Sequence, residues 1–385
     1  MRVSKNKISN PPQSVISFFS FNFDQTVILL TFVLLCFGVL MVASASMVIS
    51  DRQFGYPFHY LLHQVIYLVV GVVMATVTLY IPMQVWQKIS IPFMLFGLFL
   101  LVIVLIPGIG HVVNGSRRWI ILGIFSLQVS EIVKLSALIY LSSYLQRYLQ
   151  QVRTDFIGFL KPIMLLGIIS VLLLCEPDFG AVAVLSMMFL ALLFISGVRL
   201  WSFSLLFLLI AFALALLALT SPYRLQRLTT FLNPWNVQFG SGYQLTQSLI
   251  AFGRGGLLGV GLGNSIQKLF YLPEAHTDFL FAVITEELGL LGSLVLIFLF
   301  AWLVFKIFLI GKQAEACEDL FQTYVCYGAA IWIGLQSMIN IGVNAGVLPT
   351  KGLTLPFISY GGSSMLVNCI LIGIVLRIAH EAGEK

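Results

Sequence analysis

Ten long apolar segments are the feature that most restricts how this chain can fold. A helix that crosses a bilayer needs roughly 20 largely apolar residues. Hydrophobic residues make up 59% of the 385 and charged residues only 9%, a balance that is unusual for a soluble protein. The sequence therefore predicts an all-α polytopic membrane protein with about ten transmembrane helices. The predicted spans are Gln25 to Ser46, Gln64 to Ile81, Ser90 to Ile106, Leu127 to Gln146, Lys161 to Cys175, Gly180 to Val198, Trp201 to Thr220, Phe279 to Ile310, Tyr324 to Asn344 and Ser363 to Ile378.

The distribution of lysine and arginine predicts the orientation of these spans. With both termini in the cytoplasm, the inner segments hold twelve of these residues and the short outer loops hold four, as the positive-inside rule requires. The basic excess therefore indicates contact with membrane lipids and gives no reason to expect nucleic acid. We expect a cytoplasmic N-terminal segment (1–24), a ten-helix membrane domain (25–378) and a cytoplasmic tail (379–385).

The longest outer connection, residues 221–278, is predicted to be structured. Loops beyond about 15 residues are usually functional or disordered, and the apolar, glycine-rich sequence here argues against disorder. We expect interfacial or re-entrant helices whose irregular backbone is shielded by protein. The glycines do not indicate a nucleotide site, because no strand precedes them.

Arginines in the outer segments suggest an anionic ligand. Arg117 and Arg118 lie beside Trp119 in "NGSRRW", and Arg224 and Arg227 share one face of "YRLQRL" if that stretch is helical. Guanidinium groups bind phosphate through charge-assisted hydrogen bonds, and tryptophan stacks on sugars or lies at the membrane interface. Two interpretations stay open: anchoring to lipid headgroups, and binding of a phosphate-bearing substrate.

Glu131 and Lys134 are predicted to form an ion pair in the fourth span. They are three residues apart in "SEIVKL", which places them on one helical face. Ionisable side chains inside a membrane usually face the bundle interior and pair. A purely structural pair and a pair that orients a substrate site are both compatible with this spacing.

The outer turn "CEPDFG" carries Glu176 and Asp178 between the fifth and sixth spans. Pro177 and Gly180 favour a turn in which an acidic side chain caps the following helix. We therefore interpret this motif as structural.

Asp278 ends the polar stretch "YLPEAHTD", which also contains Glu274 and His276, immediately before the eighth span. An aspartate at the start of a helix is often an N-cap. A carboxylate among apolar neighbours can instead have a raised pKa and act as a general base. The residues alone leave both interpretations open.

Glu286 and Glu287 lie deeper, about 12 Å further along the same helix at 1.5 Å per residue. Adjacent acids inside a span need polar partners. We expect those partners to be Lys134, or Asn340 and Asn344 on the ninth span.

Taken in order, these motifs resemble the shape, elongation, division and sporulation family of bacterial peptidoglycan polymerases. The resemblance covers nearly the whole chain, and two long motifs carry most of it: "GYQLTQSLIAFGRGGLLGVGLGNSIQKLFYLPEAHTDFLFAVITEELG" and "GVLPTKGLTLPFISYGGSS". These motifs are most similar to the division member of the family, and the elongation member is the nearest relative to exclude. One departure is Val129, where the family usually has proline.

The resemblance implies a processive glycosyltransferase site on the outer side of the inner membrane. The substrate would be lipid II, a disaccharide-pentapeptide on undecaprenyl pyrophosphate. The acceptor's 4-hydroxyl would attack the donor's anomeric carbon and displace the lipid pyrophosphate with inversion. Asp278 matches the family's essential aspartate and is the candidate base. The remaining candidates are, for substrate binding, Arg117, Arg118, Trp119, Arg224, Arg227 and His276, and, in supporting roles, Glu131, Lys134, Glu286 and Glu287.

No cofactor is required by the sequence. A divalent cation, Mg²⁺ or Mn²⁺, is compatible with pyrophosphate chemistry, although no ligand cluster demands one. The family suggests a cognate class B penicillin-binding transpeptidase and division-complex activators as partners, at the division septum of a bacterial inner membrane. Three alternatives stay open: a lipid II flippase, an elongation-type polymerase, and a scaffold for division proteins.

Overall fold

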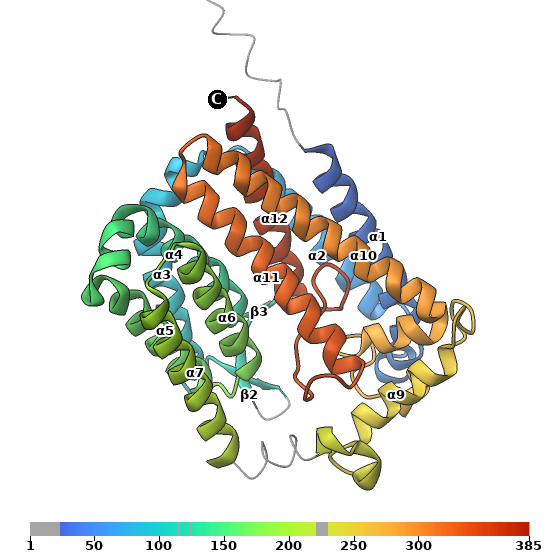
Figure 1. Ribbon diagram of the computed structural model, residues 1–385. Coiled ribbons are helices and arrows are strands. Elements are labelled where there is room, and N and C mark those ends of the chain that lie inside the picture. Colours follow the sequence, from blue (N-terminus) through green and yellow to red (C-terminus); the bar gives the residue numbers. More distant parts are fainter. Residues whose placement is uncertain (1–23, 114–115, 124, 221–229, 385) are drawn as a thin grey trace, which may run out of the picture.

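A computed structural model describes residues 24–113, 116–123, 125–220 and 230–384 (Figure 1). Arg224 and Arg227 lie outside these ranges, so their predicted role is not addressed by the structure. Within the described part, ten long helices correspond one to one with the ten predicted spans. They are α1 (Gln25–Phe54), α2 (His59–Leu79), α3 (Met83–Leu105), α4 (Val129–Thr154), α5 (Phe156–Cys175), α6 (Phe179–Ile195), α7 (Leu200–Thr220), α10 (Leu280–Ala316), α11 (Leu320–Asn344) and α12 (Gly362–Gly383).

Seven of the described helices are long and apolar enough to cross a membrane: α1, α2, α3, α5, α10, α11 and α12. Two shorter apolar helices cover Phe179–Ile195 and Leu200–Phe212. Helix α4 is long but more polar, because it carries the Glu131–Lys134 pair and several serines and glutamines. The chain is a multi-pass membrane protein, as predicted.

Among the described residues, the predicted all-helical fold is interrupted by a small antiparallel sheet between α3 and α4. It contains β1 (His111–Val113), β2 (Ser116–Leu122) and β3 (Phe125–Gln128), in that order. Trp119 pairs with Gln128 across β2 and β3. The predicted fourth span therefore begins too early, because Leu127 and Gln128 belong to β3. The amide of Gln128 donates to Ser363 Oγ of α12 over 2.7 Å.

Small residues allow α2 and α12 to pack closely. A Cβ at Gly362 would collide with the ring of Tyr67, and one at Gly373 would collide with Thr78 Oγ1. Close approach at small residues replaces the hydrophobic effect as the source of helix association inside a bilayer. The hydroxyl of Tyr67 also accepts from the amide of Ser126 in β3 over 3.1 Å. This contact joins the sheet to the helix bundle.

The described part of the long outer connection is helical in pieces, as predicted. It contains η3 (Pro234–Val237), α9 (Tyr243–Gly255) and a short irregular turn, η4 (Gln267–Tyr271). It packs on α10, which breaks at Gly289, where φ is 69° and ψ is −169°. The chain at the break exchanges backbone hydrogen bonds with the connection, including Val260 N to Glu286 O at 3.0 Å and Leu290 N to Gly256 O at 2.9 Å.

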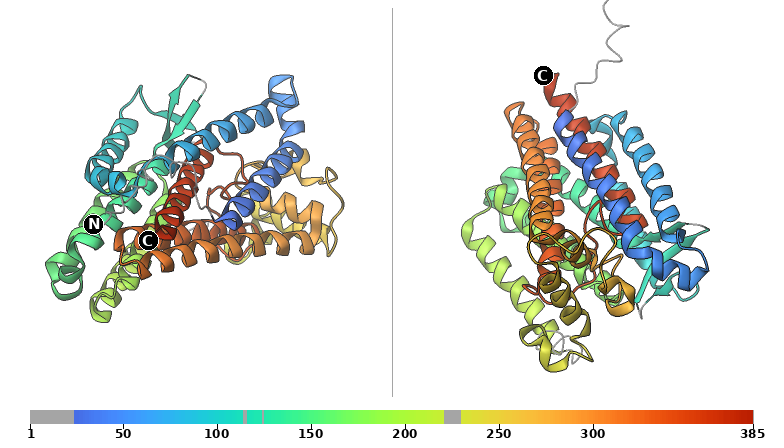
Figure 2. Two further views of the ribbon diagram at one scale, coloured as in Figure 1. Left: turned by 90° about the horizontal axis from the view of Figure 1, so that it is seen from above. Right: turned by 90° about the vertical axis from the view of Figure 1, so that its right-hand side faces the viewer.

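The sheet and the segment around α9 lie at one end of the bundle. Figures 1 and 2 show the sheet and the segment around α9 at the end opposite the C-terminus. The first turn of α1 and the end of α12 lie together at the other end. Helix α12 continues to Gly383, beyond the predicted end of its span at Ile378.

Candidate active site

Asp278 lies directly before α10 and is half-buried. Its backbone carbonyl accepts two hydrogen bonds from buried amides of α11, from Asn340 Nδ2 at 2.9 Å and Asn344 Nδ2 at 3.0 Å. The N-cap of α10 is Phe279, which makes no side-chain capping bond. Instead, the amide of Ala282 donates to Asn344 Oδ1 over 3.1 Å. An amide of the first turn of α10 is therefore capped by Asn344 of α11. The structure thus assigns to Asn344 the capping role that was one of the two interpretations of Asp278.

The segment from Lys351 to Leu355 lies across from Asp278. Asn340 Nδ2 also donates to the carbonyl of Leu353 over 2.6 Å. A Cβ at Gly352 would lie 2.9 Å from Asp278 Oδ2, so only glycine leaves that carboxylate its present space. The ammonium of Lys351 lies 5.1 Å from the ring centroid of Phe179. Sequence reasoning left Lys351 out of the site; its position in "LPTKGLTLP", among prolines and glycine in an outer segment, was the available signal.

Arg118 is held by the turn between α5 and α6. Its Nε donates to the carbonyl of Glu176 over 3.0 Å and its Nη2 to that of Pro177 over 2.5 Å. Its Nη1 lies 4.0 Å from Asp178 Oδ1. Asp178 itself caps α6 by accepting from the amide of Ala181 over 3.2 Å, so the predicted turn-and-cap role is confirmed.

Arg117 points away from Arg118, because neighbouring side chains of a strand face opposite sides. Its Nη1 donates to the carbonyl of Leu105 at the end of α3 over 3.0 Å. Its buried Nε has no hydrogen-bond partner among the described residues. Trp119 is half-buried in the same strand. The two arginines thus occupy different places and do not form a joint cationic pair.

Glu131 and Lys134 form the predicted ion pair, with 2.8 Å from Nζ to Oε1 and exposures of 4% and 1%. Lys134 Nζ also donates to Gln336 Oε1 over 2.9 Å and lies 4.9 Å from the ring centroid of Trp332. Gln336 in turn donates to the carbonyl of Thr354 over 3.0 Å. The pair therefore contacts the segment that faces Asp278 through one side chain of α11.

The predicted partners of Glu286 and Glu287 are wrong. Glu286 pairs with Arg254 of α9 at 2.6 Å, and Glu287 pairs with Lys268 at 2.8 Å. Ser44 of α1 also donates to Glu287, over 2.9 Å. The physical reason is that the described part of the long connection folds back against the break in α10 and brings Arg254 and Lys268 to the two carboxylates. The sequence had suggested partners from other spans only. Asn340 and Asn344 bind the Asp278 carbonyl instead.

His276 is enclosed by aromatic rings. Its ring centroid lies 4.5 Å from that of Tyr60 and 5.7 Å from that of Tyr360, and its Nδ1 has no hydrogen-bond partner among the described residues. Burial lowers the pKa of His276, and the nearby Glu274 carboxylate opposes that shift. His276 is only 8% exposed. Its imidazole therefore packs against neighbouring rings, and little of it is accessible to a ligand.

Glu176 is a buried carboxyl at the same outer turn. Neither of its side-chain oxygens has a hydrogen-bond partner among the described residues. Burial, together with the neighbouring Asp178 charge, raises the pKa of Glu176 from 4.5 to about 8, against a lowering contribution from Arg118. The raised pKa favours the neutral form of Glu176 at neutral pH.

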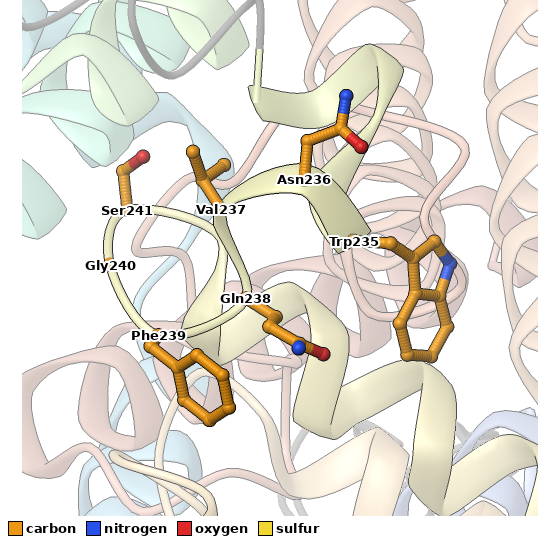
Figure 3. A pocket seen from close by; sticks show the side chains of 7 residues that line it. All are labelled: Trp235, Asn236, Val237, Gln238, Phe239, Gly240 and Ser241. Atoms are coloured by element: carbon orange, nitrogen blue, oxygen red, sulfur yellow. The ribbon is translucent and has the colours of Figure 1, made fainter.

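Two further kinds of ligand site are a metal centre and a surface pocket. No group of three or more histidine, cysteine or acidic side chains in the described ranges is placed to hold a metal ion, so a divalent cation that arrives with a pyrophosphate stays a prediction. A pocket lined by residues Trp235 to Ser241 lies within the outer connection (Figure 3). Its lining contains no ionisable side chain and none of the candidate site residues.

Comparisons with known proteins identify the chain. A family model described as "Cell cycle protein", which represents FtsW, RodA and SpoVE, matches residues 24–384. The chain belongs to the FtsW, RodA and SpoVE family. This is the family of shape, elongation, division and sporulation proteins that the motifs predicted.

Curated members of the FtsW, RodA and SpoVE family resemble this chain over nearly its full length. A probable peptidoglycan glycosyltransferase FtsW of Coxiella burnetii is 63% identical over 362 residues, covering 94% of this chain and 97% of that protein. The protein with the same name in Legionella pneumophila is 56% identical over 359 residues, covering 93% and 91%. The predicted similarity to the division member is confirmed.

Solved structures from the family share the fold. A chain of a peptidoglycan synthase complex that coordinates polymerization and crosslinking has a TM-score of 0.76 and 28% identity, covering 94% of this chain and 99% of its own length. The rod shape determining protein RodA of Thermus thermophilus has a TM-score of 0.70 and 25% identity, covering 94% and 97%. The helical bundle is therefore the family fold.

Proposed function

We propose that this protein is a peptidoglycan glycosyltransferase that polymerises lipid II during septal wall synthesis. The observation that carries the proposal is Asp278: a half-buried carboxylate whose backbone is fixed by two buried asparagines and whose facing segment carries Lys351. The curated relatives, named as probable peptidoglycan glycosyltransferases, support the same activity.

Asp278 acts as the general base. The proton of the acceptor's sugar 4-hydroxyl passes to the Asp278 carboxylate while the oxygen attacks the donor's anomeric carbon. The bond from that carbon to the phosphate oxygen breaks, and its electron pair leaves with the lipid pyrophosphate. Attack from the face opposite the leaving group inverts the anomeric centre.

The protein's cations stabilise the leaving pyrophosphate. Lys351 belongs to the segment that faces Asp278, and its ammonium lies 5.1 Å from the ring centroid of Phe179 at the start of α6. Arg118 binds the α5–α6 turn that precedes Phe179, and Arg117 is the neighbouring residue of β2. Fixed positive charge aimed at a developing anion is among the largest catalytic contributions. Trp119 offers a sugar face, and the Glu131–Lys134 pair orients the 351–355 segment through Gln336.

The protein acts in the cytoplasmic membrane at the division septum, with both termini cytoplasmic and the site on the outer face. A class B penicillin-binding transpeptidase is the proposed partner, because the similar solved chain belongs to a complex for polymerization and crosslinking. Division-complex activators would act through the outer connections and the helices.

The decisive experiment compares wild type with Asp278→Asn. Each full-length chain is purified with the transpeptidase encoded beside its gene or in the same genome, supplied with lipid II, and assayed for glycan polymer with transpeptidation blocked. We expect polymer from wild type and a loss of at least about 100-fold in the variant, with lipid II binding retained. Equal polymer from both would remove Asp278 from catalysis. Lipid II binding without polymer from wild type would instead favour a flippase.

A further inference from the structure

Asn340 and Asn344 form a buried pair on one face of α11, four residues apart, and are here called the asparagine clamp. Their exposures are 2% and 0%. Between them they make two hydrogen bonds to the Asp278 carbonyl, one to the Leu353 carbonyl and one from the Ala282 amide. All four contacts are to main-chain atoms of other segments. The clamp therefore fixes the position of the backbone. These four contacts leave the side chain of Asp278 out of the clamp's hydrogen bonds.

The two bonds to one carbonyl restrict the Asp278 peptide. A carbonyl oxygen has two lone pairs, and the clamp supplies one donor for each. Because the peptide plane that follows Asp278 is held on both sides, the direction of its Cα–Cβ bond is set by α11. The side chain is then aimed by helix packing even though Asp278 itself lies outside a helix.

Asn340 also joins the two segments that flank the Asp278 carboxylate. Its Nδ2 donates to the Asp278 carbonyl at 2.9 Å and to the Leu353 carbonyl at 2.6 Å. The register of Gly352 and Lys351 relative to Asp278 thus depends on a single amide group. One turn earlier, Gln336 holds the Thr354 carbonyl at 3.0 Å and Lys134 at 2.9 Å.

We propose that Asn340 and Asn344 are positioning residues for glycosyl transfer, which hold the Asp278 carboxylate in register with the Lys351–Leu355 segment. The proposal rests on the proposed function. Misplacement of a catalytic group by about 1 Å costs about 100-fold in rate. Loss of the clamp therefore acts mainly on turnover, because it displaces Asp278 and the Lys351 segment relative to each other, while Arg117 and Arg118 keep their contacts to α3 and the α5–α6 turn.

The test uses Asn340→Ala and Asn344→Asp in the full-length chain with its transpeptidase partner and lipid II. Asn344→Asp keeps an oxygen acceptor for the Ala282 amide and removes the donor to Asp278. Ser337→Ala is the matched control, because Ser337 is buried one turn away and donates only within its own helix, to the Ile333 carbonyl at 2.7 Å. Initial rates give kcat and KM, thermal unfolding gives stability, and hydrogen exchange reports on residues 276–283.

We expect kcat to fall about 10- to 100-fold in both variants, with KM within about 2-fold of the control. Hydrogen exchange should rise at 276–283 and stay unchanged in α12. Faster exchange with unchanged kcat would overturn the proposal. A rise in KM together with a loss of thermal stability and of kcat would also overturn it, because that pattern indicates a general structural role. Failure of both variants to fold would assign the asparagines to the bundle as a whole and overturn it too. If wild type binds lipid II but makes no polymer, the proposed function fails and the positioning role falls with it; the exchange data then show separately whether the contact holds.

Discussion

Lys268 and Glu287 form a buried ion pair across 19 residues of sequence, with 2.8 Å between Nζ and Oε1. Ser44 of α1 donates to the same carboxylate and accepts from Lys268 Nζ. One charge pair thus joins α1, the long outer connection and the broken helix α10. The described part of the connection therefore packs as part of the bundle.

Removing one partner of this pair should be strongly destabilising, because it leaves the other charge buried and unpaired. We expect Lys268→Met to cost about 3–5 kcal/mol, and the double variant Lys268→Met/Glu287→Leu to cost less than the single one. Thermal unfolding in detergent measures both. Lys306→Met is the control, since its pair with Asp24 is partly exposed, at 23% and 21%, and should cost about 0–1 kcal/mol. Equal losses at Lys268 and Lys306 would contradict the buried pair.

Reversing the Glu131–Lys134 pair tests its link to the site. Either single reversal buries two like charges and should abolish polymerisation. The double reversal Glu131→Lys/Lys134→Glu should recover only part of the activity, because the new carboxylate faces Gln336 Oε1, which now accepts from Lys134. Polymer yield from lipid II measures the recovery. A double variant no better than either single one would refute a simple pair, and full recovery would show that the Gln336 contact is dispensable.

The arginines of β2 should differ from each other and from Arg52. Arg117→Ala should weaken lipid II binding, because its guanidinium has a buried Nε without a protein partner in the described structure. Arg118→Ala should lower both binding and thermal stability, since Arg118 holds the α5–α6 turn. Arg52, which lies 4.7 Å from the Phe270 ring centroid, is the outer control. Equal binding losses at Arg52 and Arg117, measured with lipid II in detergent, would favour headgroup anchoring.

Glu176 should make stability depend on pH. Its pKa is raised from 4.5 to about 8 by burial, so between these values the folded state binds more protons than the unfolded state. The contribution of Glu176 to stability is therefore fully present below 4.5 and is lost as pH rises through about 8. We expect Glu176→Gln to flatten the dependence of the thermal midpoint over this window, while the exposed Glu318→Gln leaves it unchanged. A wild-type midpoint that rises from pH 5 to about pH 8 relative to Glu176→Gln would reverse the sign and refute the buried neutral acid.

The helices and the main candidate residue were predictable because their signals are local. Most spans are continuous apolar runs, and the capping of α1 by Asp24 and of α6 by Asp178 is likewise local in sequence. The Glu131–Lys134 pair follows from helical spacing. The motif around Asp278 identified the family, since it is a long uninterrupted stretch. Each of these features could be predicted from residues that are close together in the sequence.

The sheet and the partners of the buried charges were decided by tertiary structure. The sheet is held by residues far away in the sequence. Tyr67 of α2 accepts from the amide of Ser126, and Ser363 of α12 accepts from the amide of Gln128, both in β3. The choice of Arg254 and Lys268 for Glu286 and Glu287 depends on how the outer connection folds onto the break at Gly289.

The same division holds at the candidate site. The sequence by itself determined a multi-helix membrane protein with an aspartate at the start of its eighth span, an end that it also predicted to face outward. Only the tertiary structure decided that Asn340 and Asn344 hold that aspartate and that Lys351 lies on the segment facing it. The physical reason is that hydrogen-bond partners inside a bilayer bundle are chosen by which helix faces meet, and that choice is not written in the spacing of any single segment.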